Sequence, residues 1–177
     1  MDRLDAVGMI CDEKIRPKVD PEAAKYYMEE MLAESGARIL YGVQVSQVTM
    51  SGDRIESVII EGKSGRVAIS CRFVVDCTGD GDILDFSGED FTVYKQDIGA
   101  MWRLGNAEAL TRVTPSPTRG VRTMHTKGEL EQDGLDMYNL TRIQLGLRKR
   151  IWEDFLAKRQ LPGCEDLFIV DSPALVG

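Results

Sequence analysis

The stretch whose residues could do ligand chemistry is Thr78-Gly-Asp-Gly-Asp82, which follows the apolar run Phe73-Val74-Val75. Its two glycines allow left-handed backbone conformations and a close approach to a ligand, and exposed amides in such a turn bind oxygen atoms. A strand, a glycine turn and a helix are the order in which α/β proteins hold ligands at the carboxyl ends of their strands. We interpret this turn as one wall of a nucleotide-cofactor site.

Two other interpretations of the same stretch stay open. It is also typical of a plain turn between a strand and a helix, with Asp80 or Asp82 as the helix cap. Asp76 and Asp85 lie nearby, but the spacing of these four carboxylates does not match a calcium loop, so we predict no metal. Carboxylates repel a diphosphate, so their natural partners are hydroxyl groups or backbone amides.

The remaining candidate side chains are a histidine and three arginines. His125 is the single histidine of the chain, and it is either a surface residue or a proton donor to a bound substrate. Arg103, Arg119 and Arg122 either clamp a carboxylate substrate or lie in solvent. No Ser/His/Asp or Cys/His arrangement is recognisable, so we assign no catalytic residue.

Composition limits the classes of partner. The chain has 177 residues, 43% apolar and 29% charged, with a net charge of −7, which argues against nucleic-acid and anionic-membrane partners. No apolar run has the length of a membrane span, and the four cysteines form no CxxC pair. We expect a cytoplasmic protein that acts on a small molecule, and its oligomeric state stays open.

The first half of the chain predicts a helix followed by strands. Asp20-Pro21 starts a helix that ends at Gly36, with an apolar stripe that we expect to pack in the core. Residues 38–41 then predict a strand. Three further strands, at 43–50, 54–61 and 67–73, predict an antiparallel meander that leads into a buried strand at Val74-Val75.

The second half predicts fewer elements. A short helix after the glycine turn ends at Gly88, and strands are expected at 91–94, 98–104 and 167–170. Residues 111–138 are rich in Thr, Pro and Gly, which favours loops. Asn139 is expected to cap a long helix from 140 to about 159. Its apolar stripe is Leu140, Ile143, Leu147, Ile151 and Phe155, widened by Trp152 and Leu156.

The order of these motifs resembles the FAD-dependent oxidoreductases of the glutathione-reductase-like, two-domain flavoprotein fold. The resemblance rests on Asp20-Pro-Glu-Ala-Ala-Lys25, Ala37-Arg-Ile-Leu40, the valine-rich meander and Val75-Asp-Cys-Thr-Gly-Asp-Gly-Asp82. Residues 139–142, 161–163 and 172–177 also look like its substrate domain. The fold class implied is α/β: a partial FAD/NAD(P)-binding, Rossmann-like domain with an antiparallel β-meander, plus part of an α+β substrate domain.

The resemblance also implies roles for particular residues. The backbone of Val45 would lie against the adenine ring of FAD, and Thr78, Gly79, Asp80 and Gly81 would line its pyrophosphate or sugar portion. Residues 1–89 would form a partial FAD-binding domain and residues 90–177 a partial substrate-binding domain. The implied activity is transfer of a hydride between an organic substrate and the flavin.

One part of the family pattern is missing. The sequence contains no GxGxxG turn, which in this family grips the phosphates of the dinucleotide. We therefore expect an internal fragment of a longer flavoprotein, with weak or no affinity for FAD by itself. A non-catalytic α/β binding or structural module and an inactive flavoprotein remnant are the two alternatives.

Overall fold

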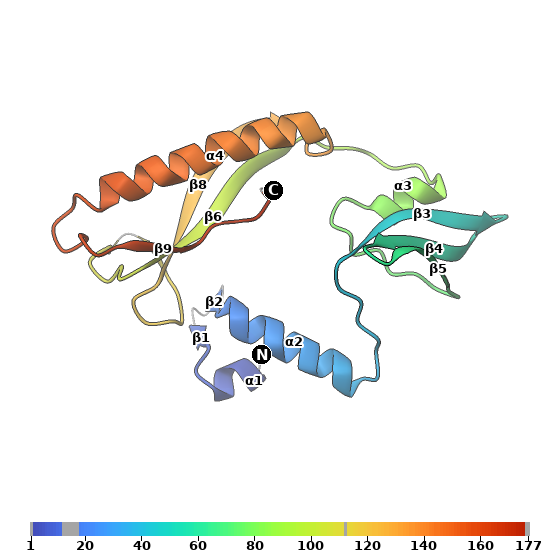
Figure 1. Cartoon of the computed structure of the whole chain (residues 1–177), viewed down its shortest axis with the longest axis horizontal. Coiled ribbons are helices and arrows are strands. Elements are labelled where there is room, and N and C mark those ends of the chain that lie inside the picture. Colours follow the sequence, from blue (N-terminus) through green and yellow to red (C-terminus); the bar gives the residue numbers. More distant parts are fainter. Residues whose placement is uncertain (1, 12–17, 112, 176–177) are drawn as a thin grey trace. The chain divides into compact units, whose positions relative to one another are not determined.

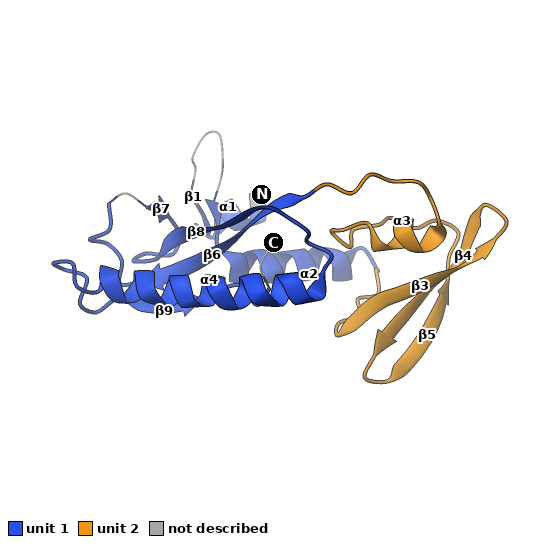
Figure 2. Ribbon diagram, turned by 90° about the horizontal axis from the view of Figure 1, so that it is seen from above, with its two compact units in different colours: residues 1–36, 95–177 blue, residues 37–94 orange. Residues whose placement is uncertain are grey.

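The computed structural model describes residues 2–11, 18–111 and 113–175 and contains two compact units. Unit 1 comprises residues 1–36 and 95–177, and unit 2 comprises residues 37–94 (Figure 2). The mixed α/β fold class with antiparallel sheets is confirmed. In these units the first 36 residues group with the C-terminal part, and the functional division expected near residue 90 stays a prediction.

Unit 1 begins with four short elements that the sequence predicts only in part. They are α1 (Asp2–Ala6), β1 (Ile10–Cys11), β2 (Lys18–Val19) and α2 (Pro21–Glu34). The expected cap of α2 is confirmed, because the Asp20 carboxylate accepts hydrogen bonds from the amides of Glu22 and Ala23, both at 3.0 Å. The helix ends before Gly36, whose φ is 76°.

The apolar stripe of α2 is not buried, which corrects the expectation of core packing. None of the residues of α2 is buried, and the side chains of Met28 and Met31 are 64% and 56% exposed. Ion pairs of Arg3 with Glu30 and Glu34 join α1 to α2. Helical periodicity predicts which residues share a face, and burial of that face requires a second apolar surface against it.

The main body of unit 1 is a four-stranded antiparallel sheet with one long helix on it (Figure 1). The strand order is β7 (Thr114–Pro115), β8 (Arg122–Gln132), β6 (Gln96–Gly105) and β9 (Phe168–Asp171). Helix α4 (Met137–Lys158) covers one face of this sheet. The strands expected near 98–104 and 167–170 are thereby confirmed.

The core of unit 1 lies between this sheet and α4. Alternate residues of β6 are buried there, namely Ile98, Ala100, Trp102 and Leu104. The predicted stripe of α4 meets them: Ile143, Leu147, Ile151 and Phe155 are all buried. The expected widening of the stripe by Trp152 and Leu156 is wrong, because these side chains are 54% and 43% exposed.

Two expectations about the segment before α4 are also wrong. Residues 111–138 contain the eleven-residue strand β8, so they are not all loop. Its Met124 packs in the core, and Thr126 accepts a hydrogen bond from the indole N–H of Trp102 at 3.0 Å. The cap of α4 is Asp136, which accepts hydrogen bonds from the amides of Tyr138 and Asn139. Asn139 itself lies inside the helix.

Unit 2 is the predicted meander followed by a short helix. Strands β3 (Val43–Ser51), β4 (Arg54–Gly62) and β5 (Gly65–Ser70) pair antiparallel in that order, and α3 (Asp82–Ser87) packs against β3. Helix α3 ends at Gly88 as expected. The buried apolar side chains of this unit are Val48, Ile60 and Ile83, which makes its core much smaller than that of unit 1.

Three strands expected in this part of the chain do not form. Within the described part of the chain, residues 38–41, 73–75 and 91–94 do not belong to any strand. The side chains of Phe73 and Val75 are 91% and 83% exposed, which contradicts the expected buried strand. A strand exists through hydrogen bonds to a neighbour, and among the described residues no neighbouring strand pairs with these segments.

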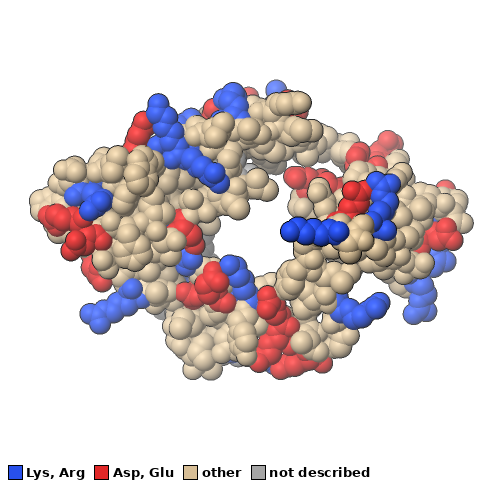
Figure 3. Space-filling view, viewed as in Figure 1, with Lys and Arg blue, Asp and Glu red and all other residues tan. Residues whose placement is uncertain are grey.

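Charged side chains of both signs are interspersed on the face of the molecule shown in Figure 3. Within the part of the chain that the structure describes, no helix combines the length and the apolar composition that crossing a bilayer would require.

Candidate functional site

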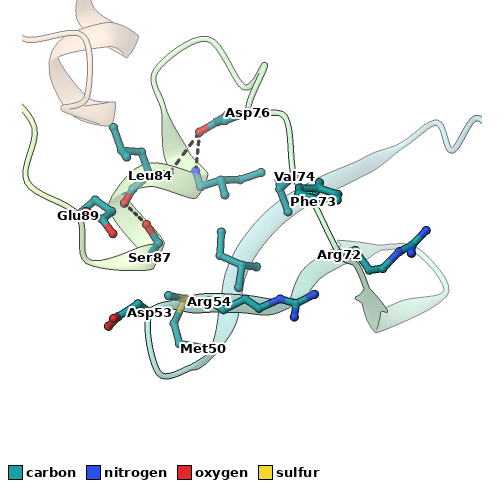
Figure 4. Close-up of a pocket in the computed structure, with 12 residues that line it drawn as sticks. Met50, Asp53, Arg54, Arg72, Phe73, Val74, Asp76, Leu84, Ser87 and Glu89 are labelled. Atoms are coloured by element: carbon teal, nitrogen blue, oxygen red, sulfur yellow. Dashed lines mark hydrogen bonds between the residues drawn. The ribbon is translucent and has the colours of Figure 1, made fainter.

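The glycine turn of unit 2 is organised by Asp76, a residue to which the sequence analysis assigns no such role. One oxygen of its carboxylate, Oδ1, accepts hydrogen bonds from the Thr78 amide at 3.0 Å and the Thr78 hydroxyl at 2.7 Å. The other, Oδ2, accepts from the amides of Ile83 and Leu84 at 3.1 and 3.2 Å. Figure 4 shows this carboxylate aimed at the first turn of α3. Asp76 therefore ties both ends of the turn together.

Thr78 completes this internal bonding. Its hydroxyl donates to Asp76 and accepts a hydrogen bond from the Asp82 amide at 2.9 Å. Gly79 and Gly81 have φ values of 98° and 78°, a region that side chains with a Cβ atom rarely adopt. The turn thus combines two glycines in left-handed conformations with the side chains of Asp76 and Thr78 on its N-terminal side, whose hydrogen bonds reach the start of α3 and fix its shape.

The turn leaves a defined set of donors for a ligand. The amides of Gly79, Asp80 and Gly81 have no hydrogen-bond partner among the described residues, and Gly79 and Asp80 are exposed. The amides at the start of α3 are already taken by Asp76. A ligand at this turn would therefore meet three backbone amides and the Asp80 carboxylate, a set that suits hydroxyl groups better than a diphosphate.

The hydrogen bonds to Asp76 hold the pKa of its carboxyl below the ordinary value. The amide of Thr78 contributes most, followed by the Thr78 hydroxyl and then by the amides of Leu84 and Ile83. The carboxylate is thus the form that the turn requires. Lowering the pH through this depressed pKa would protonate Asp76 and release the turn.

A hollow of about 370 Å³ lies on the Asp76 side of the turn. Its lining comes from the hairpin between β3 and β4, from residues 72–76 and from α3 (Figure 4). The predicted cofactor residues Thr78, Gly79, Asp80 and Gly81 do not line it. Gly79 and Asp80 are exposed on the same turn, where a ligand can approach them from solvent, whereas Thr78 and Gly81 are half-buried.

Val45, the fifth predicted cofactor residue, lies on another element. It is half-buried on β3, opposite Ile60 of β4, and the pairing shifts register directly after it. Its side chain does not line the hollow beside Asp76. A bulge of this kind exposes backbone groups that would otherwise pair in the sheet.

In unit 1 the structure brings together two of the residues singled out for substrate binding. Arg103 of β6 and His125 of β8 both line a cleft of about 470 Å³ on the sheet face away from α4. Arg122 and Arg119 do not line this cleft: Arg122 donates to the Val121 carbonyl, and Arg119 is exposed in the loop before β8.

The metal interpretation of the aspartate cluster finds no support in the structure. Both oxygens of Asp76 are engaged by hydrogen bonds, and no group of three His, Cys, Asp or Glu side chains in the described ranges is placed to hold an ion. The organising role of Asp76 has a signal in the sequence. An aspartate two residues before a threonine is typical of a turn in which the side chain accepts the later backbone amide.

Comparison with known proteins identifies the family to which the chain is similar. A family model described as FAD dependent oxidoreductase matches residues 1–172. The solved structure of a geranylgeranyl bacteriochlorophyll reductase-like protein from Thermoplasma acidophilum is similar to the chain, with a TM-score of 0.60 and 13% sequence identity. The match covers 90% of this chain and 42% of that one, so the chain spans less than half the length of its structural neighbour. No curated protein matches.

Proposed function

The chain belongs to the FAD-dependent oxidoreductase family, and from that premise we propose that it contributes part of an enzyme that transfers a hydride between an organic substrate and FAD. The family match over residues 1–172 is the observation that carries the proposal. A glutathione-reductase-like, two-domain organisation is part of the proposal. When bound, the isoalloxazine ring of FAD supplies the hydride chemistry, and the protein supplies position and electrostatics.

The residues of the glycine turn fit part of this cofactor. The free amides of Gly79, Asp80 and Gly81 and the Asp80 carboxylate suit the hydroxyl groups of a ribityl or ribose chain. Thr78 supports the turn from within, because its hydroxyl is committed to Asp76 and Asp82. We propose that Gly79, Asp80 and Gly81 contact the sugar portion of FAD, that Thr78 belongs to this site by holding the turn in shape, and that the backbone of Val45 contacts the adenine ring.

The phosphates need a separate set of donors. The sequence has no GxGxxG turn, and the amides at the start of α3 are occupied by the Asp76 carboxylate. We propose that the main phosphate contacts come from polypeptide outside these 177 residues. The affinity of the chain alone for FAD is then weak.

Substrate binding belongs, in this proposal, to the residues from about 90 onward. They contain the four-stranded sheet, α4 and the cleft that Arg103 and His125 line. In the same proposal, residues 1–89 form a partial FAD-binding domain. The first 36 of these residues pack in unit 1. The residues that take part in catalysis stay unassigned.

The proposal is tested by titrating the purified chain with riboflavin and, separately, with ADP, which together make up the FAD molecule. Riboflavin binding is followed by flavin fluorescence, and ADP binding by the heat of binding. Weak, saturable binding of riboflavin that Asp80→Ala reduces supports the assigned turn. Asp85→Ala is the matched control, because Asp85 is an exposed aspartate on α3 outside the turn. Riboflavin binding that is insensitive to Asp80→Ala contradicts the assignment.

The same experiment separates the alternatives. A folded chain that binds neither riboflavin nor ADP supports a non-catalytic module. An aggregating product with exposed apolar surface supports an inactive remnant, since Phe73 and Val75 lie in solvent.

A further inference from the structure

The strand register aligns several side chains that line the cleft of unit 1. Arg103 of β6 lies opposite Asp171 of β9 and opposite Thr123 of β8, and Thr123 also lies opposite Thr114 of β7. Residues directly opposite each other in antiparallel strands share a face, with Cβ atoms about 5 Å apart. One polar row, Asp171–Arg103–Thr123–Thr114, therefore crosses all four strands of this sheet, and each of its members lines the cleft.

A second row of cleft residues, less polar than the first, lies two residues away along β6 and β8. Met101 of β6 pairs with His125 of β8, and both line the same cleft. Their neighbours in sequence, Trp102 and Met124, point the other way into the core under α4. Val19, Pro115 and Pro117 add apolar walls. The cleft thus has a polar row on one side and mainly apolar surface on the other.

The charge of Arg103 is already compensated. Its Nε donates to both oxygens of Asp171, at 3.0 and 2.9 Å, and its Nη2 donates to the same carboxylate. Asp20 and Glu22 act on the same guanidinium through space. Of these three carboxylates only Asp171 lines the cleft, and Lys18 lines it as well. These two cationic and three anionic groups lie in or near the cleft, so most of the attraction that Arg103 would exert on an anion is offset.

The polar row nevertheless keeps hydrogen-bonding capacity. The Nη1 group of Arg103 and the hydroxyls of Thr123 and Thr114 have no partner among the described residues. The side chain of Arg103 is 15% exposed, so its free N–H groups are oriented in a partly desolvated site. Such donors favour a neutral oxygen acceptor, whose binding does not require it to approach the carboxylates as a charge.

We propose that this cleft binds a small uncharged organic molecule through a carbonyl oxygen. The oxygen accepts hydrogen bonds from Arg103 and Thr123, and the apolar body of the molecule lies against Met101 and the two prolines. His125 lies beside the bound molecule. The inference concerns unit 1 alone and does not depend on a bound flavin, so its failure and the failure of the proposed flavin function are separate results.

The test uses the full chain and two probes of similar shape, acetophenone as the neutral carbonyl and benzoate as the anion. Since His125 is the single histidine, its ring protons give one reporter signal in an NMR titration. We expect acetophenone to shift this signal saturably with a Kd of about 1 mM, and benzoate to bind roughly tenfold more weakly. No saturable shift with acetophenone up to about 10 mM, or equal or tighter binding of benzoate, overturns the proposal.

Two variants sharpen the test. Asp171→Asn keeps the shape of the residue but removes its charge, so benzoate affinity should rise about tenfold while acetophenone affinity changes little. Thr123→Val removes one donor from a strand position that suits valine, and it should weaken acetophenone about threefold or more. A benzoate affinity unchanged by Asp171→Asn, or an acetophenone affinity unchanged by Thr123→Val, overturns the assigned contacts.

A control and a folding check keep these outcomes interpretable. Thr141→Val removes a hydroxyl that donates to the Met137 carbonyl on α4, outside the cleft, and should leave the binding of both probes unchanged. The indole N–H signal of Trp102, which donates to Thr126 on the opposite side of the sheet, reports whether each variant keeps its core.

Discussion

The two units of this chain use apolar residues in opposite ways. In unit 1 the stripe of α4 and alternate residues of β6 meet in one buried cluster that includes Trp102, Leu104 and Leu147. In unit 2 only Val48, Ile60 and Ile83 are buried among the apolar residues, while Phe73 and Val75 lie in solvent. Both units have helices and paired strands where their sequence patterns predict them, although the cap of α4 and the strands expected at 38–41, 73–75 and 91–94 differ. The comparison shows that local patterns indicate where elements can form, whereas strand formation and burial also depend on whether a second strand or surface is present.

The two units also differ in the interactions that stabilise them. Unit 1 is held by packing, so its stability depends on volume in the core. The glycine turn of unit 2 is held by four hydrogen bonds to the carboxylate of Asp76, so its stability depends on charge and pH. Substitutions chosen from the two units should therefore differ in size and in the measurement that detects them.

The largest effect is expected from Leu147→Ala, at the centre of the packed core. Leu147 is fully buried, and truncating a buried leucine costs roughly 2–5 kcal/mol of unfolding free energy. Denaturant unfolding followed by tryptophan fluorescence measures it, because both tryptophans, Trp102 and Trp152, belong to unit 1. Leu145→Ala, at an exposed position of the same helix, is the control. Equal losses in the two variants would contradict the described core.

A smaller loss is expected from Asp136→Ala at the start of α4. Its carboxylate accepts hydrogen bonds from two helix amides, at 2.8 and 3.1 Å, and removing such a cap costs about 1 kcal/mol. The same fluorescence-detected unfolding measures it. Because the sequence pattern alone predicts Asn139 as the cap, Asn139→Ala is the informative comparison. Asn139 makes other hydrogen bonds, to Gln132, to the Asp133 carbonyl and with Arg142, so a loss in Asn139→Ala reports those contacts. The absence of a loss in Asp136→Ala would contradict Asp136 as the cap.

A local effect without global unfolding is expected from Asp76→Asn in unit 2. The substitution removes the charge that four donors share, so the amides of Ile83 and Leu84 should exchange their hydrogens faster. Asp85→Asn is the control, since Asp85 is an exposed aspartate of the same helix. Unchanged exchange rates in Asp76→Asn would show that the carboxylate does not hold the turn.

Acidification should act on the same turn in the same direction. Because the folded pKa of Asp76 lies below its ordinary value, its stabilising contribution is present at neutral pH. That contribution decreases once the pH falls below the ordinary range of an aspartate, about 3.9, and is lost below the folded pKa. Hydrogen exchange or NMR shifts of α3 at decreasing pH measure it. In Asp76→Asn the amides of Ile83 and Leu84 should already exchange fast at neutral pH, so acidification should change their protection little.

The smallest change in stability is expected from Phe73→Ser combined with Val75→Ser. Both side chains are exposed, so the free energy of unfolding should change by no more than about 0.5 kcal/mol. Aggregation, measured by light scattering, should decrease because an exposed apolar segment has been removed. A loss of several kcal/mol would mean that this segment packs against another surface in solution.

Much of the fold follows from the sequence, and the failures have a common physical cause. The cap at Asp20, the meander and the stripe of α4 depend on contacts within a few residues or between adjacent strands, and all three are confirmed. The segments at 38–41 and 73–75 have apolar, strand-like composition, but a strand also needs a neighbour to pair with. Composition alone therefore predicts too many strands and too many buried side chains.

The candidate site shows the same division. The position of the glycine turn and its left-handed glycines follow from the residues at 78–82. The role of Asp76 follows only in part: its position two residues before Thr78 is typical of such a turn, but its apolar neighbours indicate a buried strand. Strand β8 is hidden in the sequence because the Gly, Pro and Thr residues around it favour loops. The alignment of Arg103 with Thr123 and of Met101 with His125 is therefore visible only in the register.

The discontinuity of unit 1 has a consequence for synthesis on the ribosome. Residues 37–94 of unit 2 emerge complete before β6, and β6 emerges about forty residues ahead of the helix that covers it. The meander can therefore fold as an early, local unit, whereas Trp102 and Leu104 stay uncovered until α4 has been made. In the growing chain the nascent β6–β8 hairpin, with its apolar face open, is the stage at which chaperone contact would matter most.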